Sequence, residues 1–238
     1  MKHTSFFLST LLLLTLSSPS LGGPVTDFNI EFRSAYADYR AALFTTNSKD
    51  PAAATQSIDA FSMKWRAIVS RWGATPPPQY ADDPQWPNTL KRVSQIVSEA
   101  NQTIRSGKLS EAHEILEHLR DEIGALNLRN NVSTFSDRMN AYHEKMEKVL
   151  GGNYEGFNEN GRVRLREDIA VLEYLAGDLE KFGPKDSSDT PEFRAMLQTL
   201  RMSLQALRNA ATGADPQSIG KAIAGLKPPY SKFFLRFG

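Results

Sequence analysis

The sequence contains no cysteine among its 238 residues. This absence excludes disulfides, thiolate metal ligands, thiol catalysis, iron–sulfur clusters and the covalent attachment of haem through cysteine. A lipid anchor attached through a cysteine is excluded as well. Stability must therefore come from packing, and any metal site must use nitrogen, oxygen or thioether ligands.

Long apolar runs are absent beyond the N-terminal segment. There, an apolar stretch over residues 6–16 follows Lys2, and the small residues Ser20 and Gly22 precede a suitable cleavage point. This arrangement predicts a signal peptide over residues 1–22. No later stretch approaches the roughly 20 apolar residues that cross a membrane. We therefore expect an exported, soluble mature chain without a transmembrane segment, located in the periplasm or outside the cell.

An excess of one charge is also lacking, because 28 Lys and Arg residues face 27 Asp and Glu residues. Proteins that bind nucleic acid usually carry a basic face, so we expect no nucleic-acid partner. The sequence has no phosphate-binding glycine loop, no Gly-x-Ser-x-Gly elbow and no His-Glu-x-x-His motif. We therefore expect no nucleotide cofactor, and no feature identifies an enzyme.

Apolar residues instead recur at three- and four-residue steps, whereas no alternating pattern is long enough for a convincing strand. The spacing predicts seven long amphipathic helices and a short eighth, within residues 28–43, 58–72, 90–104, 112–126, 135–149, 165–179, 193–207 and 219–226. Asp50, Thr190 and Asp215 each precede a proline, which is typical of a capped helix start. These signals predict an all-α, multi-helix bundle of seven to eight amphipathic helices with antiparallel hairpins.

We expect residues 23–238 to form this bundle, either as one unit or as two lobes over 23–107 and 108–238. After the eighth helix, a Pro-Pro pair leads into an apolar tail that contains Phe233 and Phe234. Burial of a large apolar side chain stabilises a fold by about 1.5–3 kcal/mol. We therefore expect the tail to dock on the bundle.

The connection over residues 73–87 is rich in proline and predicts a stiff, extended segment. It has two interpretations. In the first, it is a strap across the end of the bundle with its aromatic side chains packed inward. In the second, it is a binding lip for a ligand, a protein or a glycan, formed by Tyr80, Asp82, Asp83 and Trp86.

The most specific chemical signal is a pair of similar motifs. Residues 113–117 read His-Glu-Ile-Leu-Glu, and residues 143–147 read His-Glu-Lys-Met-Glu. Residues four apart share one face of a helix, so each histidine points the same way as the glutamate that ends its motif. His113 with Glu117 and His143 with Glu147 both border an apolar stripe. The two pairs are therefore candidate ligands.

The short connection between the two helices predicts an antiparallel hairpin. If its turn centres near residue 130, His113 lies level with Glu147, and Glu117 lies level with His143. Two imidazoles and two carboxylates suit iron, copper or zinc. The bland interpretation is that two His–Glu hydrogen bonds fix the register of the hairpin.

Three further residues are candidate ligands. Met139 and Met146 lie one turn on either side of His143, and their thioethers favour copper, although methionines on an apolar stripe are usually core residues. Asp168 lies within the apolar arc of the next helix, where its structural interpretation is a salt bridge to Arg164.

The sequence therefore predicts an exported helical protein that binds or delivers a transition metal ion without catalysis, through His113, Glu117, His143 and Glu147. The rival hypothesis is a scaffold or interaction module that contacts an unknown protein partner through residues 73–87. A third possibility, an oxidase with two metal ions, requires more carboxylates than the sequence places near these histidines.

Overall fold

The computed structural model describes residues 22–213 and 215–238. The signal peptide expected over residues 1–22 lies outside the described residues except for Gly22. The described part contains helices and no strand, which confirms the all-α class. The elements are α1 Pro24–Asn47, α2 Pro51–Trp72, η1 Pro78–Tyr80, α3 Trp86–Arg105, α4 Leu109–Arg129, α5 Phe135–Leu150, η2 Glu155–Phe157, α6 Glu159–Lys181, α7 Pro191–Thr212, α8 Pro216–Ala224 and α9 Lys227–Phe237.

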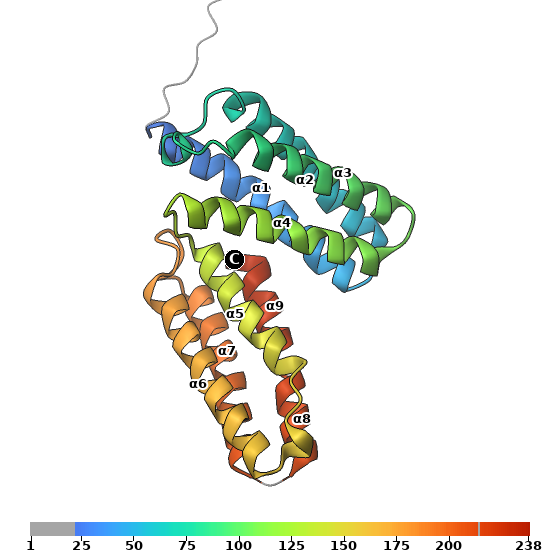
Figure 1. Cartoon of the computed structure of the whole chain (residues 1–238), viewed down its shortest axis with the longest axis vertical. Coiled ribbons are helices and arrows are strands. Elements are labelled where there is room, and N and C mark those ends of the chain that lie inside the picture. Colours follow the sequence, from blue (N-terminus) through green and yellow to red (C-terminus); the bar gives the residue numbers. More distant parts are fainter. Residues whose placement is uncertain (1–21, 214) are drawn as a thin grey trace, which may run out of the picture.

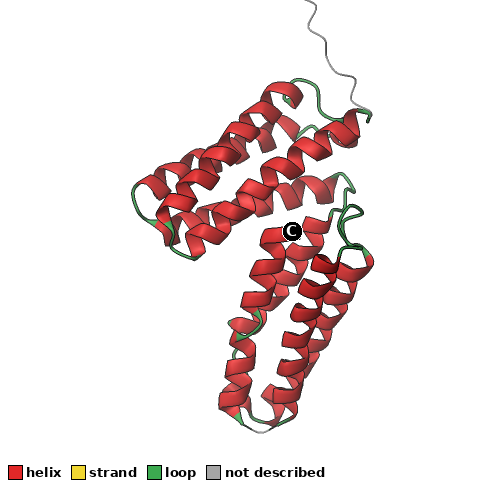
Figure 2. Cartoon of the chain, turned by 180° about the vertical axis from the view of Figure 1, so that it is seen from behind, coloured by secondary structure: helices red, strands yellow, loops and turns green. Residues whose placement is uncertain are grey.

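The helices form two bundles that meet at an angle (Figures 1 and 2). In the first bundle, α1 packs against α2 and α4, and α3 closes the ring by packing against α2 and α4. In the second bundle, α6 packs against α5 and α7, while the short helices α8 and α9 together take the place of a fourth helix. Each bundle has its own apolar interior because each helix buries one face.

The division between the bundles differs from the lobes expected at residues 107 and 108. Helix α4 packs on α1 and α3, so it belongs to the first bundle, and the bundles separate at residues 130–134. The expected hairpin of α4 with α5 is also not formed as a closely packed pair, because α5 packs on α6 and α9 instead. A short turn brings two helix ends together but does not oblige the helices to lie side by side.

Helix α9 joins the two bundles. It packs on α7 and α5 of the second bundle and also on α1 of the first, and Figure 1 shows it between α5 and the first bundle. Phe233 and Phe234 are buried, which confirms that the C-terminal tail docks. The Arg40 Nε of α1 donates to the Leu235 carbonyl at 3.3 Å. The tail is a ninth helix, one more than the sequence predicted.

The predicted helix starts are present. The Asp50 side chain accepts from the Ala53 amide, and the Thr190 hydroxyl accepts from the Phe193 amide. Asp215 accepts two amide hydrogen bonds in the first turn of α8. Such caps satisfy amides that have no partner within the helix, and each stabilises its helix by about 1 kcal/mol.

The segment over residues 73–87 packs inward, as the strap interpretation predicts. Trp86 is 1% exposed, and its indole donates to the Trp72 carbonyl at 2.9 Å. The Tyr80 hydroxyl is buried against Asn127 of α4. Asp83 accepts from Arg129 at 2.8 Å and is also buried. Of the four residues in the expected binding lip, only Asp82 is exposed, so the segment lacks the aromatic contacts that the interaction hypothesis requires.

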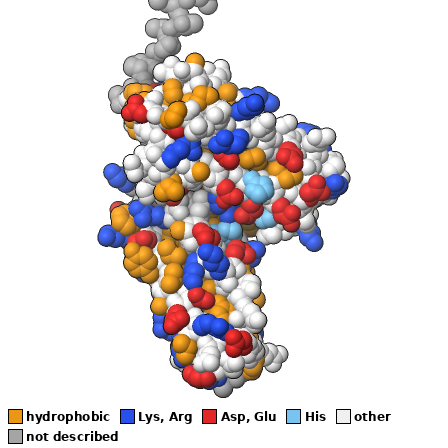
Figure 3. Space-filling model, in the orientation of Figure 1, with side chains coloured by type: hydrophobic (Ala, Val, Ile, Leu, Met, Phe, Trp, Pro, Cys, Tyr) orange, Lys and Arg blue, Asp and Glu red, His pale blue; other side chains and the backbone are white. Residues whose placement is uncertain are grey.

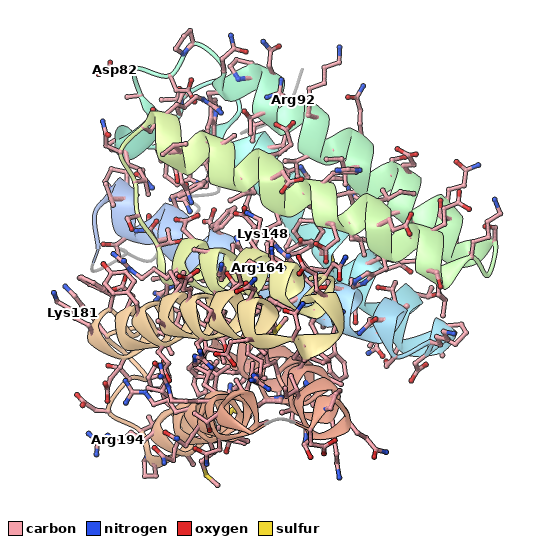
Figure 4. All side chains as sticks on the ribbon, turned by 60° about the horizontal axis from the view of Figure 1, so that its bottom comes forward. Asp82, Arg92, Lys148, Arg164, Lys181 and Arg194 are labelled. Carbon is pink, nitrogen blue, oxygen red and sulfur yellow. The ribbon has the colours of Figure 1, made fainter. Side chains whose placement is uncertain are left out.

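The outer surface carries charges of both signs. Figure 3 shows basic and acidic side chains interspersed over one face of both bundles, with histidine side chains near the level where the bundles meet. Figure 4 shows Asp82, Lys181 and Arg194 projecting outward from the helices and loops. Among the described residues, no helix has the combination of length and apolar character needed to span a membrane.

Candidate metal centre

A pocket of about 300 Å³ lies where α1 and α4 of the first bundle face α5 and α9 of the second. We call it the junction pocket. Apolar side chains of α1 and α9 line part of its wall. Its ionisable lining residues are His113, Glu117, Arg120, His143, Glu147 and Lys227. The structure therefore brings both His–Glu pairs to one pocket, although α4 and α5 do not pack closely.

His113 is held by the first bundle. Its Nδ1 lies 3.0 Å from the Leu43 carbonyl of α1 and 3.2 Å from the Thr46 hydroxyl. Because the carbonyl can only accept, Nδ1 carries the proton in a neutral ring and donates it to Leu43. The other nitrogen, Nε2, then has a free lone pair, and it lies 3.4 Å from Glu117 Oε1. Two acceptor atoms thus face each other inside the pocket.

Arg120 lies between the two His–Glu pairs. Its side chain is only 9% exposed, and its Nη1 donates to Glu117 Oε2 at 3.0 Å. The same Nη1 makes a short contact with His143 Nδ1. Since a guanidinium has no acceptor, His143 Nδ1 must accept, and the ring proton of neutral His143 is on Nε2.

The outer side of His143 faces Glu147. The imidazole Nε2 lies 3.4 Å from Glu147 Oε1, which is long for a hydrogen bond but places the N–H opposite a carboxylate. Lys227 of α9 approaches the same oxygen at 3.1 Å. The His143 ring also stacks on Tyr230, with 5.2 Å between ring centroids. Helices α5 and α9 together therefore fix the orientation of His143.

The protonation states follow from these surroundings. Burial lowers the pKa of His113 below 6.5, and the nearby carboxylate of Glu117 offsets this only in part. The pKa of Glu147 is lowered to about 2, first by its contact with His143 and then by Lys227, while burial opposes the shift. At neutral pH, His113 is therefore neutral and Glu147 is ionised. The guanidinium of Arg120 stays charged because its pKa is raised.

Both histidines share one arrangement. Each has one N–H directed toward an outer acceptor, Leu43 or Glu147, and one lone pair directed toward Glu117 or the Arg120 that binds it. Histidines that ligate metals usually have this arrangement, in which an outer acceptor holds one nitrogen and the other faces the ion. The inner set of acceptors is His113 Nε2, the Glu117 carboxylate and His143 Nδ1.

In residues 22–213 and 215–238, no group of three or more histidine and acidic side chains lies close enough together to hold a metal ion. The three inner acceptors surround a guanidinium, which already supplies a positive charge. The side chains that line the pocket thus have the donor types of a metal site but are spread around Arg120.

The remaining sequence candidates lie away from the junction pocket. Met139 and Met146 are fully buried and do not line it, so they are core residues. Asp168 accepts from the Tyr154 hydroxyl at 2.8 Å and forms an ion pair with Lys145. The salt bridge expected with Arg164 is replaced by this pair. His118 is exposed at the surface of α4, as expected.

Three pocket residues were absent from the sequence prediction, namely Arg120, Lys227 and Tyr230. Arg120 follows His113 by seven residues and Glu117 by three, so helical spacing places it on their face. That signal was available in the sequence. Lys227 and Tyr230 come from α9, and nothing in the local pattern indicates that this helix reaches α4 and α5.

Comparison of the chain with protein-family models, with curated proteins and with solved structures finds no match.

Proposed function

We propose that this chain is a carrier that acts after export and binds one transition metal ion, without catalysis, in the junction pocket. The ligands are His113 Nε2, the Glu117 carboxylate and His143 Nδ1. Glu147 has a supporting role, accepting the outer N–H of His143. This assignment keeps the residues that the sequence suggested and changes the role of Glu147 from ligand to support.

One observation carries the proposal. His113 Nε2 and Glu117 Oε1 are both acceptors, and they face each other at 3.4 Å while the ring proton of neutral His113 is directed to Leu43. Such a pair is stable only with positive charge close by. Two ligands on one tetrahedral ion, each bonded at about 2.0–2.1 Å, lie about 3.4 Å apart. The pair therefore has the separation of one edge of a tetrahedral metal site.

The donor set indicates the class of metal. Two imidazoles and a carboxylate suit Zn²⁺, Fe²⁺ and Cu²⁺, whereas Cu⁺ prefers sulfur ligands. The buried positions of Met139 and Met146 remove the thioethers that favoured copper. A two-metal oxidase is not favoured, because the pocket offers only two carboxylates and Asp168 is bound elsewhere. No additional general base is positioned in the pocket, so a carrier fits better than an enzyme.

The decisive experiment is a Zn²⁺ titration of the purified chain, without its signal peptide, by isothermal calorimetry together with elemental analysis. We expect one ion per chain in the wild type and no binding in the His113→Ala, His143→Ala double variant. His118→Ala is the matched control, because His118 lies on the same helix but is 71% exposed. It should bind as the wild type does.

Two acidic variants test the separate roles of the glutamates. Glu117→Gln removes a ligand and should abolish binding. Glu147→Gln removes only the support for His143 and should weaken binding by about 10- to 100-fold. A wild type that binds no ion, or a double variant that binds as well as the wild type, would refute the proposed function.

A further inference from the structure

Arg120 occupies the position where the proposed ligands converge. Its Nη1 contacts both Glu117 Oε2 and His143 Nδ1, which are two of the three inner acceptors. The second guanidinium nitrogen, Nη2, also donates to Glu117, at 3.3 Å. A metal ion cannot bind these lone pairs while the guanidinium donates to them. Arginine and metal are therefore competitors for one set of atoms.

The competition does not relax with pH, because the guanidinium keeps its charge throughout the range in which proteins are stable. Lys227 differs, although it also carries a positive charge into the pocket. Its side chain is 43% exposed, and it pairs with Glu147, outside the inner set. Water therefore screens the Lys227 pair, while the buried Arg120 pair acts at close range.

Arg120 also has a place to move. Its guanidinium carbon lies 5.4 Å from the centre of the Phe234 ring, and its Nε is buried without a hydrogen-bond partner. A side chain with an unsatisfied donor is less firmly fixed than one with all its donors paired, because a buried donor without a partner costs about 1–3 kcal/mol. The pocket mouth beside α9 offers the space into which the guanidinium can turn.

We infer that Arg120 is a built-in competitor that weakens metal binding at the proposed site, so that the ion is held reversibly. The inference rests on the proposed function. In it, the guanidinium supplies the positive charge that Glu117 needs when no ion is present, and an arriving ion must displace it from Glu117 and His143. A carrier that must release its ion requires this kind of limit on affinity.

The test compares two matched substitutions, Arg120→Met and Lys227→Met, by titration with Zn²⁺. Both remove one positive charge from the pocket and put the same apolar side chain in its place. We expect Arg120→Met to bind Zn²⁺ about tenfold or more tightly than the wild type, since each charged hydrogen bond lost by the competitor is worth at least that factor. Lys227→Met should change the affinity by about threefold or less.

A second measurement needs no metal. In ¹⁵N-labelled protein, long-range proton–nitrogen spectra report the state of each ring nitrogen of His143. We expect the wild type to have an unprotonated Nδ1 that accepts a hydrogen bond and a protonated Nε2. In Arg120→Met, the Nδ1 resonance should move toward that of a nitrogen without a donor, whereas Lys227→Met should leave it unchanged.

Different outcomes overturn different claims. If the wild type binds Zn²⁺ and a folded Arg120→Met variant binds it equally or more weakly, the inference fails and the proposed function stands. Equal tightening in both methionine variants also overturns the inference, because net charge alone would then explain it. Absence of binding in every folded variant refutes the proposed function and the inference together. Should Arg120→Met fail to fold, Arg120→Lys decides, with tighter binding expected because lysine cannot reach both acceptors as arginine does.

Discussion

At the scale of single residues, His113 has a titration that is coupled to folding. Burial lowers its pKa in the folded chain below the value of 6.5 expected when unfolded. Below about pH 6.5, the unfolded chain therefore binds more protons at this residue than the folded chain does. The contribution of neutral His113 to stability is complete above this pH and is lost as the pH falls toward the lowered pKa.

We predict that the free energy of unfolding decreases between pH 7.5 and pH 5.5 in the wild type, and that His113→Gln reduces this decrease by up to about 1 kcal/mol. Glutamine retains an N–H that can reach the Leu43 carbonyl but does not titrate. Glu147 does not contribute in this range, because its pKa of about 2 makes it titrate below its ordinary 4.5. Urea unfolding followed by circular dichroism measures the change.

The control is His118→Gln, which replaces an exposed histidine on the same helix. It should retain the full pH dependence of the wild type. An undiminished pH dependence in His113→Gln would show that another group is responsible.

The sequence predicted the residues of the junction pocket only in part. Spacing within a helix placed His113 with Glu117 and His143 with Glu147, and both pairs do line one pocket. The same spacing includes Arg120, yet its role depends on how far apart α4 and α5 lie. A register argument gives the heights of residues along two helices, but not the distance that a long side chain must bridge.

At the scale of elements, α9 shows why one helix was missed. It begins at Lys227 and has prolines in its first turn. A proline pair in the sequence usually indicates extended structure, but the first turn of a helix tolerates proline because the amides there have no partner within the helix. The following residues, Tyr230, Phe233 and Phe234, then share the buried face. The other helices were predicted because their stripes were long and their starts capped.

We predict that Phe233→Ala in α9 lowers the free energy of unfolding by about 3–5 kcal/mol. Phe233 is fully buried, and its ring lies 5.1 Å from that of Phe193 in α7 and 6.1 Å from that of Phe135 in α5. Its loss leaves a cavity in the interior of the second bundle. Urea denaturation monitored by far-ultraviolet circular dichroism measures the effect.

The matched control is Lys232→Ala, the neighbouring exposed position of the same helix. It should change the free energy of unfolding by about 0.5 kcal/mol or less. Equal effects of the two substitutions would mean that α9 is only loosely attached to the bundle.

At the scale of the whole molecule, the arrangement of the two bundles was the least predictable feature. Every helix has an apolar face, so periodicity shows which side is buried but not which helix covers it. Helix α4 could have covered either α5 or the helices before it, and it packs on α1 and α3. The choice depends on the summed fit of many side chains.

The tryptophans give a test of how strongly the bundles are coupled. All three, Trp65, Trp72 and Trp86, lie in the first bundle, so tryptophan fluorescence reports that bundle alone, whereas circular dichroism reports both. We predict coincident urea transitions in the wild type, because α9 connects the bundles. In Phe234→Ala, which removes a buried α9 ring beside Arg120, the dichroism signal should begin to fall at lower urea than the fluorescence. If both signals shift together in this variant, the bundles unfold as one unit and α9 is not the element that couples them.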